Sequence, residues 1–129
     1  MGSDILVVDD SAAIRKILQR VLRQTGVVID NILEAGDGQE ALEALKSRKI
    51  DLVLSDINMP KMDGLQFLAA MKASVQWRHI PVVMITTEGG ETKVAEAVRL
   101  GAAGYVRKPF TADQIKEKLT GLIEPALPL

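Results

Sequence analysis

Hydrophobic residues gather in short runs along this chain, and most of the runs end in a polar or acidic residue. Three nearly unbroken runs cover residues 5–8, 52–54 and 82–85, and two weaker ones cover residues 31–34 and 104–106. Uninterrupted hydrophobicity over a few residues is typical of a strand that is buried on both faces, as in a parallel sheet. The pattern therefore predicts five β-strands.

Segments with the hydrophobic period of a helix lie between and after these runs. Two of them begin with the pattern of a capping box, in which Asp37 pairs with Glu40 and Thr111 pairs with Gln114. Strands that alternate with helices, joined by right-handed crossovers, place helices on both faces of the sheet. We therefore expect an α/β protein with a doubly wound five-stranded parallel sheet and helices at residues 11–24, 39–48, 64–72, 92–100 and 112–123.

Polar side chains follow the predicted strands at the points where these strands end. Asp9 and Asp10 follow the first strand, Asp56 the third and Thr86 the fourth, while Lys108 lies just after the fifth. In doubly wound sheets the ligand crevice lies beyond the carboxyl ends of the strands. A single polar residue there often only caps a neighbouring helix, but complementary groups at every central strand favour a binding site.

The composition narrows the classes of function. The 129 residues are 47% hydrophobic and 26% charged, which suits one domain with one well-buried core. With no cysteine and with His79 as the single histidine, the chain has no disulfide, no thiolate nucleophile and no histidine or cysteine cage for zinc. A formal charge of -1 offers no basic stripe for nucleic acid.

No apolar run approaches the roughly 18 residues that would indicate a membrane-spanning helix. The first residues also lack the basic and apolar regions of a secretory signal. We therefore expect a cytoplasmic protein with no membrane insertion. Residues 1–3 are consistent with a cloning scar, and residues 125–129 form a proline-broken tail.

The residues at the predicted edge suit phosphoryl chemistry. Two carboxylates in close contact repel each other by about 4 kcal/mol at an effective dielectric of about 20, so Asp9, Asp10 and Asp56 need a cation. Oxygen ligands with room for water suit Mg2+, and also Mn2+, better than zinc. A carboxylate can attack phosphorus and form an acyl phosphate when cations neutralise the transferring group. Lys108 supplies a fixed positive charge, and Thr86 supplies a hydroxyl donor.

Five short motifs, in their order and spacing, resemble those of the response regulator receiver domain family. They extend over essentially the whole chain: Val7-Val8-Asp9-Asp10, Ser55-Asp56-Ile57-Asn58-Met59-Pro60, Met62-Asp63-Gly64, Thr86-Thr87-Glu88 and Lys108-Pro109-Phe110. The resemblance implies a receiver domain over residues 4–124. It also implies the flavodoxin-like strand order 2-1-3-4-5.

The resemblance further implies a role for each acidic residue at the edge. Asp56 would be the phosphoacceptor. Asp10 and Asp56 would bind Mg2+ directly, together with the backbone carbonyl of Asn58, and Asp9 would reach the ion through water. Asn58 and Glu88, each two residues beyond a site residue, would flank the path of the hydrolytic water and tune dephosphorylation.

Other positions would bind the phosphoryl group or report its presence. By the same resemblance, Thr86, Thr87 and Lys108 would hold the phosphoryl oxygens. The bond before Pro109 would be cis and would place Lys108 through a tight turn. Thr86 and Tyr105 would form the switch, with the tyrosine ring turning inward when the threonine moves toward phosphate; an ordinary half-buried strand tyrosine is the alternative.

Within the family, the chain looks most like the free-standing chemotaxis regulators of the CheY type, at residues 56–60, 104–106, 108–110 and 117–119. This implies phosphorylation by a sensor histidine kinase and a changed surface on the last two helices and the strand between them. The downstream partner would be the flagellar motor switch, with a phosphatase as a further partner. Such a protein is a signalling protein that catalyses only its own phosphoryl transfer and autodephosphorylation.

Three alternatives stay open at this point. A stand-alone relay receiver in a phosphotransfer cascade would share all of this chemistry. A phosphorylation-independent pseudo-receiver would act only through protein contacts, although the intact Asp56 and Lys108 argue against it. A phosphatase with an aspartate nucleophile would normally carry a second acid two residues later, where this chain has Asn58.

Overall fold

Five strands and five helices alternate over the described part of the chain. The structure is a computed structural model, and it describes residues 2–87 and 91–122. The strands are β1 (Ser3–Val8), β2 (Ile29–Ala35), β3 (Leu52–Asp56), β4 (Val82–Thr86) and β5 (Gly104–Arg107). The helices are α1 (Ala12–Gln24), α2 (Gly38–Ser47), α3 (Gly64–Lys72), α4 (Glu91–Leu100) and α5 (Ala112–Leu119).

All five strands run parallel in one sheet, in the order β2-β1-β3-β4-β5. The predicted fold class and strand order are therefore confirmed. Along the central strands the register pairs Val8 with Ser55 and Asp56 with Ile85. Because the strands are parallel and nearly level, their carboxyl ends meet at one edge, and the residues that follow them share a common site.

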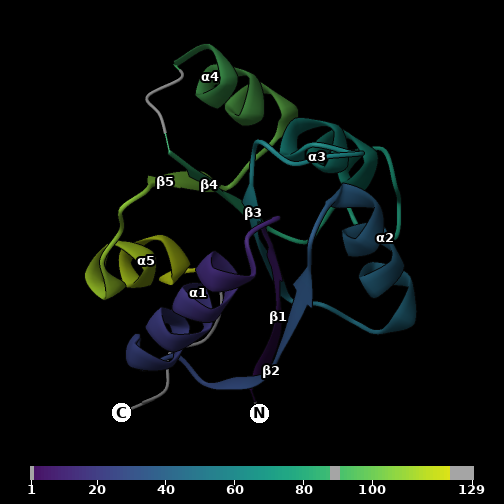
Figure 1. Cartoon of the computed structure of the whole chain (residues 1–129). Helices are drawn as coiled ribbons and strands as arrows, with labels where there is room; N and C mark the ends of the chain where they lie inside the picture. The colour runs from purple at the N-terminus through teal and green to yellow at the C-terminus, as the bar shows by residue number, and fades with distance from the viewer. Residues whose placement is uncertain (1, 88–90, 123–129) are drawn as a thin grey trace.

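Helices cover both faces of the sheet (Figure 1). Helices α1 and α5 lie on one face, and α2, α3 and α4 lie on the other. Strand side chains alternate between two buried clusters: Ile5 and Val7 pack with α1 and α5, whereas Leu6 and Val8 pack with the other three helices. This explains the unbroken hydrophobic runs, since a strand covered on both faces needs apolar residues at every position.

Helix α5 is shorter than predicted. The hydrophobic pattern indicated a helix over residues 112–123, but α5 ends at Leu119. Thr120 follows with φ -59° and ψ 125°, which is not helical, and its N–H donates to the Lys116 carbonyl. The prediction was wrong here because apolar residues continue past the point where the backbone leaves the helix. Ile123 and the predicted tail lie outside the described residues.

One of the two predicted capping boxes is confirmed, and the other is half formed. At α5, the Thr111 hydroxyl accepts from the Gln114 N–H, and the Gln114 side chain accepts from the Thr111 N–H. At α2, the Asp37 carboxylate accepts from the Glu40 N–H at 2.9 Å. The Glu40 carboxylate, however, accepts from the N–H of Gly36 at 2.7 Å rather than from that of Asp37.

Within the described ranges, 2–87 and 91–122, no helix has both the length and the apolar character needed to cross a membrane.

Candidate functional site

Three carboxylates meet where the central strands end. Asp9 follows β1, Asp10 comes next, and Asp56 is the last residue of β3. One oxygen from each lies within 4.8 Å of the others. Asp9 and Asp56 are buried, with 1% and 7% of their surface exposed, whereas Asp10 is exposed. The three acids that the sequence placed at one edge are therefore brought together, with an open side toward solvent.

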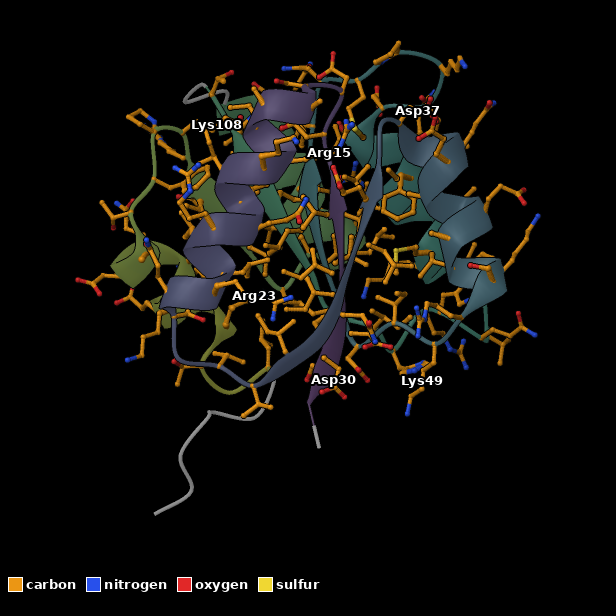
Figure 2. The ribbon with its side chains drawn as sticks, turned by 60° about the horizontal axis from the view of Figure 1, so that its bottom comes forward. Arg15, Arg23, Asp30, Asp37, Lys49 and Lys108 are labelled. Carbon is orange, nitrogen blue, oxygen red and sulfur yellow. The ribbon has the colours of Figure 1, made fainter. Side chains whose placement is uncertain are left out.

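Lys108 supplies the positive charge in this cluster. Its Nζ lies 2.8 Å from Asp9 Oδ2 and 3.6 Å from Asp56 Oδ2. Its backbone N–H donates to the Thr86 carbonyl at 2.7 Å, and the Lys108–Pro109 peptide bond is cis. Figure 2 shows Lys108 at the same end of the sheet as Arg15, with Asp30 and Lys49 at the opposite end. A single ammonium group cannot balance three carboxylates, so the site keeps an excess of negative charge.

Asp9 is held in place from several sides. Its N–H donates to the Ala35 carbonyl at 3.0 Å, and its Oδ1 accepts from the Ser11 N–H at 2.9 Å. Arg15 of α1 donates through Nη1 to the Asp9 carbonyl and through Nε to Glu34 Oε1 at 2.8 Å. With both its main chain and its side chain bonded, Asp9 is a fixed part of the site and not a mobile surface acid.

The environment of Asp56 disfavours its charged form. Burial raises the pKa of the Asp56 carboxyl above its ordinary value, and the charge of Asp9 raises it further. Lys108 and the backbone N–H groups of Ile57 and Asn58 oppose this shift. Asp56 Oδ1 accepts from the Ile57 N–H at 2.8 Å, which leaves Oδ2 facing Lys108. A second cation at this position would stabilise the ionised carboxylate.

The donor set fits a hard divalent cation. Carboxylate oxygens are the ligands that Mg2+ prefers, and Mg2+ usually keeps several of its waters. Asp9, Asp10 and Asp56 offer oxygens only, and the exposed side of Asp10 leaves room for water. The negative charge that Lys108 leaves unbalanced is a second reason for a cation to bind.

Thr86 and Thr87 lie on opposite sides of the end of β4. Thr86 is buried, with 5% of its surface exposed, and pairs in register with Arg107 of β5. Thr87 is exposed and lies beside an apolar hollow of about 400 Å³ between α1 and the segment before α5. Besides Thr87, the hollow is lined by Ile14, Ile17, Lys108, Pro109 and Phe110. Lys108 borders both this hollow and the carboxylate cluster, so the two lie next to each other.

Tyr105, the predicted switch residue, points outward. The residue lies on β5, pairs in register with Met84, and has 37% of its surface exposed. The ammonium group of Lys118 lies 6.0 Å from the centroid of its ring, at the limit of a cation–π contact. Val98 of α4 is also exposed, at 56%, which leaves apolar side chains on the surface of α4 and β5. Glu88, predicted to tune dephosphorylation, lies outside the described residues.

The main chain of Asp56 is packed against the start of α3. Gly64 begins this helix, and its N–H donates to the Ile57 carbonyl at 2.7 Å. A Cβ at position 64 would lie 2.1 Å from the Asp56 carbonyl oxygen. Asp63 and Gln66 form a reciprocal capping box there, with bonds of 2.8 and 3.0 Å, which the sequence reading did not anticipate. The helix start therefore fixes the backbone that carries the central carboxylate.

Two basic residues at this edge were missed from the sequence. Arg15 braces Asp9, as described above, and Lys93 of α4 donates through Nζ to Asn58 Oδ1 at 2.7 Å. Both lie on amphipathic helices at positions where a basic residue is ordinarily in contact with water. The sequence held no signal for either contact, because each depends on how a helix packs against neighbouring parts of the fold.

Known proteins share this architecture over nearly the whole chain. Residues 5–120 match the response regulator receiver domain family. The chemotaxis protein CheY of Pseudomonas aeruginosa is 42% identical over 120 residues, covering 93% of this chain and 95% of that protein. The structure of CheY4 from Vibrio cholerae superposes with a TM-score of 0.84 at 32% identity, covering 95% of this chain and 100% of that one.

A further solved structure bears on the chemistry of the site. It is the CheX-CheY-BeF3-Mg+2 complex from Borrelia burgdorferi, with a TM-score of 0.82, 30% identity, and coverage of 93% of this chain and 88% of that one. The family match and these relatives agree with the parallel sheet and with the acidic cluster at its edge. This chain belongs to the response regulator receiver domain family.

Proposed function

We infer that this protein is a phosphorylation switch of the chemotaxis type, in which Asp56 accepts a phosphoryl group. The observation that carries the proposal is the convergence of Asp9, Asp10 and Asp56 within 4.8 Å beside Lys108. Few other activities need a buried carboxylate nucleophile, two further acids and a fixed ammonium at one strand edge. The proposed receiver domain spans residues 4–124, and the family match covers most of that range.

The transfer begins with an attack by the Asp56 carboxylate on the phosphoryl donor. An Asp56 carboxylate oxygen attacks phosphorus, the bond from phosphorus to the donor atom breaks, and the donor keeps the electron pair. The Asp56 oxygen that faces Lys108 at 3.6 Å is the natural nucleophile, since its partner oxygen is engaged by the Ile57 N–H. Lys108 then neutralises charge on the transferring group. The ion pair with Asp9 holds the Lys108 ammonium group in place at the site.

The acidic cluster would hold Mg2+, with Mn2+ as a substitute. Asp10 and Asp56 are proposed as direct ligands with the Asn58 carbonyl, and Asp9 as a ligand through water. When bound, the ion supplies positive charge to the phosphoryl oxygens. The comparison with the Borrelia burgdorferi complex, whose name includes both BeF3 and Mg, supports the same pairing here.

The phosphoryl oxygens would be bound by residues at the ends of β4 and β5. Thr86 is proposed to donate its hydroxyl to one oxygen, with Lys108 and the exposed Thr87 completing the set. When Thr86 moves toward phosphate, the space behind it would be taken by Tyr105, which is partly exposed on β5. Phosphorylation would thereby shift a pre-existing equilibrium of the surface formed by α4, β5 and α5.

The proposed partners follow from the chemotaxis relatives and from this surface. A sensor histidine kinase would donate the phosphoryl group, and the surface with Val98 and Tyr105 would bind the downstream target, with the flagellar motor switch as our proposal. A phosphatase is proposed as a further partner, in line with the complex of CheX with CheY.

The test is phosphorylation by acetyl phosphate, followed by mass spectrometry and by fluorescence of Trp77 and Tyr105. We expect a gain of one phosphoryl group that needs Mg2+ and is lost in Asp56→Asn. Asp30→Asn is a matched control, because Asp30 lies at the opposite end of the sheet (Figure 2). A wild-type protein that gains no phosphoryl group would instead be a phosphorylation-independent interaction module.

A further inference from the structure

The loop after β3 and the start of α4 form the rim of the site. A hydrogen bond crosses this rim, outside the carboxylate cluster. Lys93, near the start of α4, donates from Nζ to Asn58 Oδ1 at 2.7 Å, across 35 positions of sequence. Asn58 lies two residues beyond Asp56, in the loop that leaves β3. Both side chains are exposed, so the bond stands on the surface. Nothing in the proposed transfer reaction uses Lys93.

The bond joins the two connections that leave neighbouring strands. Strands β3 and β4 are adjacent in the sheet, with Asp56 at the end of one and Thr86 at the end of the other. Asn58 belongs to the chain that leaves β3, and Lys93 belongs to the helix that follows β4. A contact between them ties the position of α4 to the loop that follows Asp56.

We propose that Lys93 is a positioning residue for the phosphorylation site: it holds the Asn58 side chain across the rim and thereby slows hydrolysis of the phosphoryl group on Asp56. This inference rests on the proposed function. In hydrolysis, a water oxygen attacks phosphorus, the bond from phosphorus to the Asp56 oxygen breaks, and the carboxylate is regenerated while one water proton is released. A fixed Asn58 narrows the approach of that water.

A consequence is that α4 regulates the lifetime of the signal. Any partner that moves the start of α4 separates Lys93 from Asn58 and opens the rim. Conversely, the bond resists displacement of α4 while it is intact. Both effects depend on the same hydrogen bond between Lys93 and Asn58.

The alternative is that the bond is an ordinary surface contact. Exposed pairs of this kind contribute little to folding stability. Stability is therefore the wrong readout, and the rate of hydrolysis is the right one, because the proposal assigns the bond an effect on the approach of water. A double-mutant cycle separates an effect that acts through Asn58 from a general effect of the Lys93 charge.

The experiment measures loss of the phosphoryl group after removal of acetyl phosphate, with Mg2+ present. We expect Lys93→Met to shorten the lifetime by about two- to tenfold, the range for one hydrogen bond. Lys93→Arg should restore a lifetime close to that of the wild type, because arginine keeps a charged donor. In an Asn58→Ala background, Lys93→Met should have no further effect. Lys49→Met, the same change at the far end of the sheet, is the control (Figure 2).

Several outcomes would overturn the inference. These are an unchanged or longer lifetime in Lys93→Met, an equal shortening in Lys49→Met, or an undiminished effect in the Asn58→Ala background. A second readout is independent of phosphorylation. The side-chain amide signals of Asn58 in NMR spectra should shift in Lys93→Met and stay near their original positions in Lys93→Arg. If the wild type takes up no phosphoryl group, the proposed function fails, and these signals still decide whether the contact exists.

Discussion

Replacing Gly64 with alanine would push apart two pieces of backbone that the fold holds in contact. The added Cβ would lie 2.1 Å from the Asp56 carbonyl oxygen and 2.8 Å from the Ile57 Cα. These are main-chain atoms of a buried strand end, and they cannot rotate away as a side chain can. Overpacking of a filled interior costs about 1–3 kcal/mol, and we expect the loss in the free energy of unfolding to lie near the upper end of this range.

The same substitution should also impair the chemistry. Because the Gly64 N–H donates to the Ile57 carbonyl, relief of the clash has to move α3 away from the loop or shift the end of β3. A shift of the end of β3 displaces the Asp56 carboxylate from Lys108, which is 3.6 Å away. We therefore expect Gly64→Ala to be phosphorylated more slowly by acetyl phosphate, even under conditions in which the variant is fully folded.

The assay is urea denaturation followed by fluorescence. A loss of about 3 kcal/mol would lower the midpoint by about 1–2 M urea, for a slope of about 1.5–3 kcal/mol/M. Gly26→Ala is the matched control, because Gly26 has φ +81° but no atom within 4 Å of an added Cβ, so it should lose only about 1 kcal/mol from backbone strain. If Gly64→Ala loses no more than Gly26→Ala, the contact with Asp56 is not as tight as described.

Two further predictions concern the charges of the site. Since burial and Asp9 raise the pKa of Asp56, Asp56→Asn in EDTA should unfold at higher urea than the wild type at neutral pH. This difference should shrink as the pH falls toward the ordinary carboxyl value of about 4. Separately, Mg2+ at about 100 times its Kd should stabilise the wild type by about 2.7 kcal/mol in urea titrations. Asp10→Asn should lose most of this gain, whereas Asp30→Asn should keep it.

The sign of the pH effect follows from proton linkage. A carboxyl whose pKa is raised by folding holds its proton in the native state while the unfolded state has already lost it. Between the two pKa values the native state binds more protons, so stability falls as the pH rises through this window. A difference between Asp56→Asn and wild type that does not change with pH would contradict the raised pKa. An undiminished Mg2+ effect in Asp10→Asn would place the ion elsewhere.

The sequence was sufficient to predict the fold and the convergence of the polar residues at one edge of the sheet. A strand buried on both faces needs an unbroken apolar run, so strands such as residues 52–54 could be found directly and lengthened only slightly, to Leu52–Asp56. Because parallel strands end at one edge, the polar residues Asp9, Asp56 and Thr86 had to converge. The motifs of the family then gave the order of the strands.

The remaining contacts depend on how the helices, strands and loops pack in three dimensions, which the order of residue types along the chain does not show. Arg15 and Lys93 reach the edge at which the strands end because of the way α1 and α4 pack in the folded protein. The end of α5 was misplaced because hydrophobic period says little about where a backbone leaves the helix. The Glu40 bond to Gly36 likewise depends on the path of the turn rather than on the spacing of the residue types.

Strand side chains alternate between two buried clusters. This separates positions at which packing restricts substitution from positions at which it does not. Every residue of β3 is buried, so substitutions within it disturb packing on one face or the other. The residues just beyond the strand ends, such as Asn58 and Thr87, are exposed and belong to neither cluster. Under the proposed function, single substitutions at this edge would change the lifetime of the phosphoryl group, or the choice of partner, without repacking the interior. The fold therefore consists of a buried framework that tolerates few substitutions and of exposed positions at the strand ends where substitutions are tolerated.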